Sequence, residues 1–482
     1  MHFAIIAKVL GILLMLFSLT LMPPLLISLW YGDGTYGSFI LAFGITFTTG
    51  LLAWMPVHNI HDDLSTRDGF LITALFWTVL ALFGSLPLIL ADATQLSVTD
   101  AVFESLSGLT TTGATVLTGL DQLPRSILFY RQQLQWLGGI GIIVIAVAIL
   151  PMLGVGGMQL YRAETPGPVK DSKLTPRITE TAKALFMIYV SLTAACAGSY
   201  WLAGMPPFEA IAHSFATVAI GGFSTHDASI GYYDSGPIML VCSLFMVLAG
   251  INFALHFLAW QSRGISHYVR DPEFRFYLSM LAVGLVITVG YLASSGIYDI
   301  QTSVLYGIFE LISILTTTGF GVADFSIWPT FLPYLIFMFA FMGGCAGSTG
   351  GGIKMIRVLL IMKQGLREIH RLIHPNAMIP IKLGRNTISD RVVEAVWGFF
   401  AVYVICYLVM VVVLLAMGLD FVTAFTAVGA CLNNLGPGLG DVAAHYGNIS
   451  DSAKWVLCFA MLLGRLEVFT LLVLFTPMFW RR

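Results

Sequence analysis

The stretch LTTTGATV, residues 109–116, and its near copy LTTTGFGV, residues 315–322, place three threonines and a glycine inside a very apolar chain. Of the 482 residues, 57% are hydrophobic and only 10% are charged. Soluble domains carry about 25% charged residues, so a water-soluble core of this size is excluded. A polar, turn-prone pentapeptide that recurs in such a chain marks a place where the backbone leaves its helix within apolar surroundings.

Long apolar segments indicate that the chain crosses a membrane several times. A helix needs about 20 apolar residues to span a bilayer. The first segment, Phe3 to Trp30, is too long for the core of a signal peptide and is interpreted as a true span. Five further runs approach or exceed the required length: Phe70–Ala91, Ala182–Ala203, Pro237–Trp260, Phe274–Ala293 and Val396–Met417. The sequence therefore predicts an all-α polytopic membrane protein.

Charge is distributed unevenly over the connections between these segments, although the net charge is only −2. Acid-bearing connections with almost no Lys or Arg lie at 92–100, 227–234, Asp299, Asp324 and 441–451; Arg125, Arg131 and Lys454 are exceptions on that side. Basic connections hold Arg162, Lys170, Lys173 and Arg177; Arg263, Arg270 and Arg275; and Lys354, Arg357, Lys363, Arg367, Arg371, Lys382, Arg385 and Arg391. Cytoplasmic loops are rich in Lys and Arg, so we expect the basic connections and both termini in the cytoplasm of a cell whose inner membrane holds the protein.

The TTTG motif anchors an internal repeat, and repeats define the architecture of a chain. Aligning GFSTHDASI, from Gly222, with GFGVADFSI, from Gly319, adds a third copy, and NNLGPGLGDV adds a fourth at Gly436. Each copy reads as a span, a short apolar segment, a loop and a second span. Apolar runs of 10–14 residues are typical of re-entrant segments, which we expect at 98–112, 207–221, 303–318 and 420–435.

We therefore predict ten spans and four re-entrant pore helices around a pseudo-fourfold pore. The expected division is two N-terminal transmembrane helices in 1–60 and pore repeats in 61–165, 166–270, 271–380 and 381–482. Every basic connection then falls on one side of the membrane and every glycine loop opens on the other.

The four glycine loops have a composition that suits cation binding. Irregular backbone at membrane depth is tolerated only in protein or beside a water-filled cavity. Glycine allows the backbone to turn successive carbonyls to one side, and rings of carbonyl oxygens replace the hydration shell of K⁺ in channel filters. The alternative is an ordinary set of Gly/Thr helix breaks in a packed bundle. The expected K⁺ ligands are Thr111, Thr112, Gly113, Ile220, Gly221, Gly222, Thr317, Thr318, Gly319, Asn434, Leu435 and Gly436.

Together with these loops, FYRQQLQWLGGIGIIVI (129–145) and MGGCAGSTGGGIKMIRV (342–358) resemble the Trk/Ktr/HKT superfamily of potassium transporters over essentially the whole chain. The resemblance implies a channel-like potassium pore, a homodimer, and a cytosolic ring of nucleotide-binding TrkA subunits with RCK domains. Gly113 matches the potassium-selective pattern, since plant relatives that transport sodium carry serine there. The fourth loop, NNLGPG, departs from TTTG. K⁺ is the expected transported ion, and we expect no organic cofactor in this chain.

A glycine-rich stretch, GGCAGSTGGGIK from Gly343 to Lys354, interrupts a predicted span. Each glycine costs a helix about 1 kcal/mol relative to alanine, so a regular helix is disfavoured. Ile353 separates the last glycine from Lys354, which excludes a Walker loop. The stretch is either tight packing of small residues or a flexible gate beneath the filter. The expected gate residues are Gly343, Gly344, Gly347, Gly350, Gly351, Gly352 and, in the last span, Arg465.

Arg465 lies inside the last apolar segment, two residues before Glu467. A charge at such depth costs several kcal/mol and usually faces a cavity or a partner. In the repeat alignment Arg465 matches Gly139, Gly250 and Gly344. It is either half of a structural pair, with Glu467 as one partner, or a positive barrier below the filter.

Other repeated positions have simpler interpretations. Glu104 and Glu310 lie nine residues before their glycines, where the other copies carry His213 and Ala427. We expect the glutamates to brace the loops by hydrogen bonding. Asp227, Asp324 and Asp441 follow the loops and either concentrate cations at the mouth or cap a turn.

Three classes of function remain to be compared. A pore gated from the cytoplasm fits four parallel repeats that share an axis. A proton- or sodium-coupled secondary transporter is the alternative, although such proteins typically carry inverted repeats. An enzyme is not expected, because the spans contain no HExxH motif and no nucleophile–base constellation, and the six cysteines form no metal-binding cluster.

Overall fold

The computed structural model describes residues 2–60, 65–144, 178–384 and 386–481. The first basic connection, with Arg162, Lys170, Lys173 and Arg177, and the expected boundary between the first two repeats lie outside the described residues. The described fold is all-α apart from one small hairpin, in which strand β1 (Lys382–Leu383) pairs antiparallel with β2 (Asn386–Thr387).

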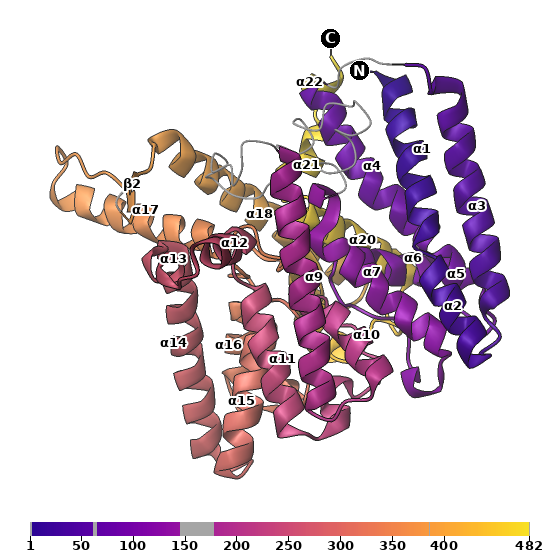
Figure 1. Cartoon of the computed structure of the whole chain (residues 1–482). Helices are drawn as coiled ribbons and strands as arrows, with labels where there is room; N and C mark the ends of the chain where they lie inside the picture. The colour runs from indigo at the N-terminus through magenta and orange to yellow at the C-terminus, as the bar shows by residue number, and fades with distance from the viewer. Residues whose placement is uncertain (1, 61–64, 145–177, 385, 482) are drawn as a thin grey trace.

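Two N-terminal spans stand along one side of the body (Figure 1). The first is built from α1 (Phe3–Leu19) and α2 (Met22–Tyr31), and the second is α3 (Tyr36–Trp54). Gly11 on α1 and Gly50 on α3 let the two backbones meet, because a Cβ on either glycine would lie 2.7 Å from the carbonyl oxygen of the other. Small residues at helix crossings are the usual way in which membrane helices approach closely.

The remaining helices follow the order expected of four repeats. Each repeat begins with a span: α4 (Thr66–Gly84) continued by α5 (Leu86–Leu90), α9 (Ile178–Leu202), α14 (Pro272–Ser295) and α18 (Asp390–Ala416). Each continues with a short helix: α6 (Val98–Leu109), α10 (Pro207–Val218), α15 (Ile300–Leu315) and α19 (Phe421–Leu432). The second spans are α7 (Arg125–Val144), α11 (Gly236–Ala249) with α12 (Phe253–Ser262), α16 (Leu332–Phe339) with α17 (Met355–Ile373), and α20 (Asp451–Arg465) with α21 (Phe469–Leu472). Short helices α13 (Ser266–Arg270) and α22 (Pro477–Trp480) complete the described elements.

Fewer regular spans are present than the ten predicted. Six helices or continuous helix pairs in the described residues are long and apolar enough to cross a membrane, and two sharply bent pairs bring the number to eight. The other two second spans fail this test for physical reasons. Helix α7 carries Arg131, Gln132, Gln133 and Gln135, and α16 has only eight residues before the glycine-rich stretch begins. The chain is thus a polytopic membrane protein with four span–re-entrant helix–span repeats, whose second spans are irregular.

All four second spans break at the register of the repeat alignment. Gly141 leaves the helical conformation inside α7 (φ 56°, ψ −158°), close to Gly139. The bend between α11 and α12 is 93° and contains Gly250, and the bend after Arg465 is 110°. The third break is the non-helical stretch that contains Gly344. The breaks bring irregular backbone to the centre of the protein in every repeat.

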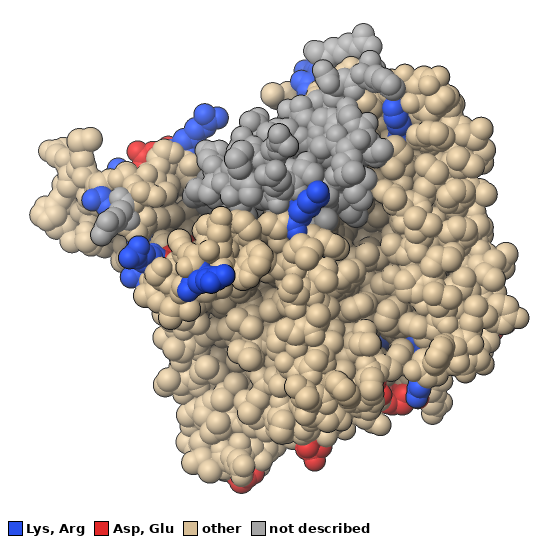
Figure 2. Space-filling model, in the orientation of Figure 1, with Lys and Arg blue, Asp and Glu red and all other residues tan. Residues whose placement is uncertain are grey.

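Charge divides the surface into two ends. Figure 2 shows Lys and Arg mainly toward the end where both termini lie, Asp and Glu mainly toward the opposite end, and a broad uncharged band between them. An uncharged band of this kind fits the apolar interior of a bilayer.

Candidate functional site: a ring of four loops

All four short helices end in the same way, four residues before the aligned glycine. In each, the amide of the second residue after the C-cap bonds to the carbonyl five residues back at 2.8 Å, which is the long bond of a Schellman motif. The four bonds are Thr112 N to Ser107 O, Gly221 N to Ala216 O, Thr318 N to Ser313 O and Leu435 N to Ala430 O. The helix ends at 98–112, 207–221, 303–318 and 420–435 were predicted three residues too late, because those last three residues turn into the loops.

The left-handed position of each motif is held by a residue that does not favour it. Schellman motifs usually place glycine there, but these loops carry Thr111 (φ 55°), Ile220 (φ 55°), Thr317 (φ 67°) and Asn434 (φ 53°). Residues in such sparsely populated regions cost about 1–3 kcal/mol each and persist only where the surroundings enforce them. Four enforced turns at the same position of the four repeats indicate a functional site.

The four glycines close a ring. Each approaches the carbonyl oxygen of the residue that precedes the next glycine, so closely that a Cβ would collide with it. The contacts return to their starting point: Gly113 to Gly221 O, Gly222 to Thr318 O, Gly319 to Leu435 O and Gly436 to Thr112 O. All four glycines have positive φ, from 77° to 98°. The repeated glycines are therefore required both by backbone conformation and by close approach.

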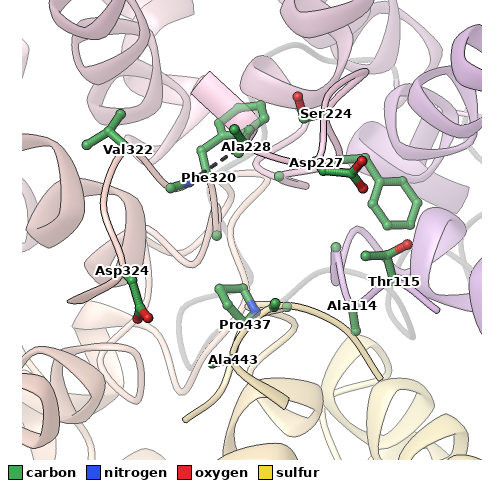
Figure 3. A pocket seen from close by; sticks show the side chains of 18 of the residues that line it. Ala114, Thr115, Ser224, Asp227, Ala228, Phe320, Val322, Asp324, Pro437 and Ala443 are labelled. Carbon is green, nitrogen blue, oxygen red and sulfur yellow. Dashed lines mark hydrogen bonds between the residues drawn. The ribbon is translucent and has the colours of Figure 1, made fainter. Parts of the chain in front are cut away.

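A vestibule of about 430 Å³ lies outside the ring and includes all four glycines in its lining. Figure 3 shows the loops converging on it from different repeats. Asp227 and Asp324 line it, and each also accepts a backbone amide hydrogen bond, from Leu120 and Ser326 respectively. Asp324 therefore combines both expected positions, at the mouth and capping a turn, whereas Asp227 lies at the mouth and bonds to the first repeat. Asp441 does not line the vestibule.

The glutamates behind the ring form bracing hydrogen bonds. Glu104 accepts from Val116 N (2.9 Å) and from Arg131 Nε (2.7 Å). Glu310 accepts from the amides of Val322 (2.7 Å) and Ala323 (3.0 Å). In the second repeat, His213 contacts Ser224 Oγ at 2.9 Å. In the fourth repeat, Ala427 has no polar side chain, and the hydroxyl of the neighbouring Thr426 accepts a hydrogen bond from Leu439 N.

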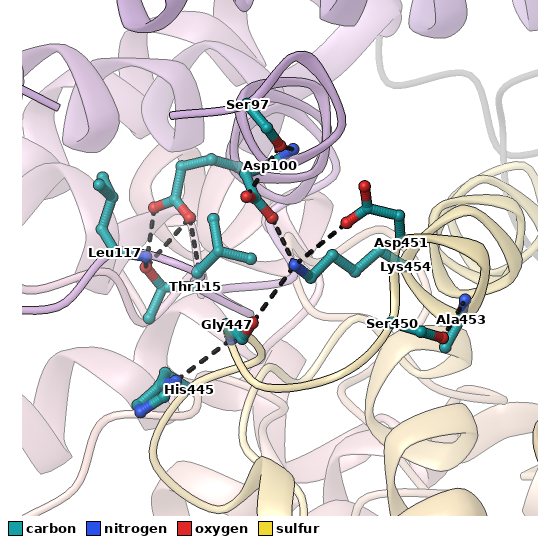
Figure 4. Close-up of polar contacts among 12 residues, drawn as sticks. Ser97, Asp100, Thr115, Leu117, His445, Gly447, Ser450, Asp451, Ala453 and Lys454 are labelled. Carbon is teal, nitrogen blue, oxygen red and sulfur yellow. Dashed lines mark hydrogen bonds and ion pairs between the residues drawn. The ribbon is translucent and has the colours of Figure 1, made fainter. Parts of the chain in front are cut away.

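Polar contacts also join the fourth repeat to the first. Lys454 on α20 pairs with Asp100 on α6 at 2.6 Å, although its own side chain is only 4% exposed (Figure 4). Asn434 Nδ2 donates to Thr112 Oγ1 at 3.0 Å, and Tyr446 N donates to Thr115 O at 2.8 Å. Lys454 was an exception to the charge rule, and its buried pair explains why it lies on the acidic side.

The glycine-rich stretch lies directly beneath three of the four loops. Thr349 Oγ1 donates to Val218 O (2.8 Å), Gly351 N to Thr317 Oγ1 (2.8 Å) and Gly352 N to Asn433 O (3.0 Å). At both ends the stretch is held by one carboxylate, since Glu273 Oε1 accepts from Ala346 N and Ile356 N. Three of the expected gate glycines, Gly350, Gly351 and Gly352, therefore contact the underside of the ring.

Arg465 lies beneath the remaining loop. Its guanidinium is 3.3 Å from Thr111 Oγ1, hydrogen-bonds to Gly138 O and lies 5.1 Å from the Trp77 ring. Glu467 pairs with Arg357 at the start of α17, which connects the last span to the helix after the glycine-rich stretch. Gly350, Gly351, Gly352 and Arg465 thus lie against the underside of the ring, whereas Gly344 and Gly347 lie next to Gly250 and Asn252 at the bend between α11 and α12.

Two ring-contacting residues were not predicted as site residues from the sequence, although Arg131 was noted as an exception to the charge rule. Arg131 Nη1 donates to Ser224 O at 3.0 Å, and Gln135 contacts Gly221 and Phe223. Both belong to the polar face of α7, and their spacing of four residues places them on one side of the helix. Polar residues at that spacing in an apolar segment were the available signal.

Four re-entrant helices, a ring of backbone loops and an outer vestibule are typical of a membrane transport protein. A family model described as TrkH, cation transport protein, matches residues 37–482, and the chain belongs to that family. It is 59% identical over 482 residues to the Trk system potassium uptake protein TrkH of Halomonas elongata and 53% identical to that of Escherichia coli, with full coverage of both chains. It also matches the crystal structure of the potassium transporter TrkH from Vibrio parahaemolyticus with a TM-score of 0.91, 52% identity and full coverage.

These findings confirm the expected membership of the Trk/Ktr/HKT superfamily, within which the chain is closest in kind to TrkH. They place the protein in a transport family and not among enzymes.

The buried Arg131–Glu104 pair yields the first prediction. Replacing Arg131 by Met leaves the carboxylate of Glu104 buried without its cation, and breaking such pairs costs about 3–5 kcal/mol. We expect a clearly lower midpoint of thermal unfolding in detergent. Arg125→Met, an exposed arginine on the same helix, should leave the midpoint nearly unchanged, and adding Glu104→Gln to Arg131→Met should restore part of the loss. An Arg131→Met midpoint equal to that of the parent would contradict a structural role for this pair.

Proposed function

We propose that the protein carries K⁺ into the cell across the inner membrane through a selective, channel-like pore. The observation that carries the proposal is the closed ring of four loops, each set by a strained left-handed residue and a glycine with positive φ. Rings of carbonyl oxygens are the established way to replace the hydration shell of K⁺. The printed names of the relatives, potassium uptake proteins and a potassium transporter, support K⁺ as the transported ion.

The proposed ion ligands are backbone carbonyls of the four loops, with hydroxyls of the threonines assisting in the first and third. Side chains differ among the loops, whereas the backbone conformation repeats. Ligation by backbone accounts for that combination. The proposed ligand set is Thr111, Thr112, Gly113, Ile220, Gly221, Gly222, Thr317, Thr318, Gly319, Asn434, Leu435 and Gly436.

The proposed gate is the layer beneath the ring. An ion that leaves the ring toward the cytoplasmic end meets the glycine-rich stretch and the Arg465 guanidinium. The stretch continues directly into α17, whose first turn pairs with Glu467 through Arg357. A cytosolic partner that displaces α17 would therefore pull on the gate.

The proposed partners are a second copy of the chain and cytosolic nucleotide-binding subunits of the TrkA type with RCK domains. The word system in the relatives' names supports association with other components. The basic end of the molecule, with both termini, is the proposed cytoplasmic face. Proton- or sodium-coupled transport remains the alternative, since broken helices near mid-membrane also occur in secondary transporters.

Gly113→Ser tests the ring. A side chain there would collide with Gly221 O and would also strain a residue at φ 82°. We expect the ratio of K⁺ to Na⁺ flux into proteoliposomes to fall about tenfold. A displaced carbonyl ligand that weakens the preference for K⁺ by about 1.4 kcal/mol produces a change of that size. Gly119→Ser is the matched control, because Gly119 also has positive φ (70°) but nothing within 4 Å of its Cβ position. An unchanged ratio in Gly113→Ser, or flux that requires a proton or sodium gradient, would favour the coupled transporter.

Arg465→Ala tests the barrier. A positive unit charge within about 10 Å of a passing cation raises the free energy of that cation by about 1–2 kcal/mol at an effective dielectric constant of about 20. Its removal should raise K⁺ flux about tenfold. Arg67→Ala serves as control, because Arg67 is exposed and bonds to Arg481 O. A well-folded Arg465→Ala protein with the same K⁺ flux as the parent would contradict a barrier role for Arg465.

A further inference from the structure

The second loop of the ring is chemically different from the first and third. Thr110 and Thr112 join their hydroxyls at 2.8 Å in the first loop, and Thr316 and Thr318 do so in the third at the same distance. The second loop has Ala219 and Gly221 at the matching positions, so it has neither hydroxyl.

A side chain from the neighbouring repeat fills the space that this substitution leaves. A Cβ built on Gly221 would meet the amide of Gln135, with Nε2 at 2.8 Å and the other two amide atoms closer still. Those three atoms are the nearest to the Cβ position. Gly221 is also absent from the residues with positive φ, so its backbone does not itself demand glycine. A side chain at 221 would therefore have to displace the Gln135 amide, which occupies its place.

The Gln135 amide bonds to the loop on both sides of Gly222. Its Nε2 donates to Gly221 O at 2.6 Å, and its Oε1 accepts from Phe223 N at 3.0 Å. A flipped amide would place oxygen against oxygen and N–H against N–H, so the network fixes the orientation. Gln135 is fully buried, and a buried amide with both ends satisfied is a stiff support.

The Gln135 amide donates its hydrogen bond to a carbonyl oxygen of the ring. Gly221 O is the oxygen that Gly113 approaches, so it lies at the contact between the first and second loops. In the described part of the chain, the equivalent oxygens of Thr112, Thr318 and Leu435 receive no side-chain hydrogen bond. The hydrogen bond from Gln135 therefore makes one quarter of the ring electronically and mechanically different from the rest.

We propose that Gln135 is a positioning residue for ion selectivity, which supplies from α7 the side chain that the second loop lacks and fixes the carbonyl of Gly221. The inference rests on the proposed function of the ring as a cation filter. Gln135 does not contact the ion; it acts through the carbonyl that it holds.

The test removes the Gln135 side chain, adds a side chain at position 221, and then combines the two changes. Gln135→Ala removes the donor, and loss of one hydrogen bond should lower the K⁺ over Na⁺ flux ratio in proteoliposomes by up to about tenfold. Gly221→Thr alone should be as damaging, because its side chain collides with the Gln135 amide. The double variant Gln135→Ala/Gly221→Thr gives the second loop one of the two hydroxyls that the first and third loops carry, in the space that Gln135 vacates, and its ratio should return toward that of the parent.

Gln133→Ala is the matched control. Gln133 lies on the same helix and is also buried, but its Nε2 donates to Thr20 O at 2.8 Å in the first N-terminal span. Its removal should leave the ion ratio unchanged. A Gln135→Ala ratio equal to that of the parent would overturn the proposal while leaving the filter itself intact.

Folding and function can be separated in the same experiment. If Gln135→Ala does not fold, recovery of a folded, selective protein in the double variant still supports the proposal, and no recovery overturns it. A parent protein that shows no K⁺ preference would instead refute the proposed function on which the inference rests.

Discussion

The ring of loops closes through the approach of each loop glycine to the carbonyl oxygen of the next loop. Because a Cβ at Gly113, Gly222 or Gly319 would collide with that oxygen, the four loops can meet only if glycine occupies these positions. The Schellman motifs, with their non-glycine left-handed residues, bring the chain to that contact at the same angle in each repeat. The bracing glutamates and the buried Arg131 then hold the loops from behind. The four-repeat fold serves to bring these loops to one axis.

The two faces of the ring have different physical characters. The outer face opens into a vestibule that is lined in part by Asp227 and Asp324. The inner face is covered by the glycine-rich stretch and by Arg465, which bond to the loops themselves. Backbone made of glycine can rearrange with little steric cost, whereas the half-buried guanidinium of Arg465 carries a positive charge that repels cations. An acidic outer face and a covered, positive inner face are the features that the proposed path, filled from outside and opened from below, requires.

The sequence predicted the repeats, the short helices and the ring glycines, because each copy carries the same constraint and the copies can be aligned. It predicted the ends of the short helices three residues late. The left-handed turn that ends each helix is formed by residues such as Thr111 and Ile220, and the glycine that usually marks such a turn in a sequence is missing there. It also predicted more regular spans than exist, because hydropathy cannot show a 93° or 110° bend. Gln135 was missed because its role depends on a contact with Gly221, 86 residues away in the chain. The spacing of Arg131 and Gln135 marked a polar face of α7, but one sequence does not show which loop that face contacts.

The most direct measurement is the position of a heavy K⁺ analogue in crystals of the protein. Rb⁺ or Tl⁺ scatters anomalously and can be located without reference to the protein phases. If the ring is the cation filter, the anomalous peak lies on its axis, within ligand distance of carbonyl oxygens from all four loops. A peak confined to the vestibule near Asp227, or no peak at the ring in saturating Rb⁺, would contradict a carbonyl filter and leave the loops a structural role.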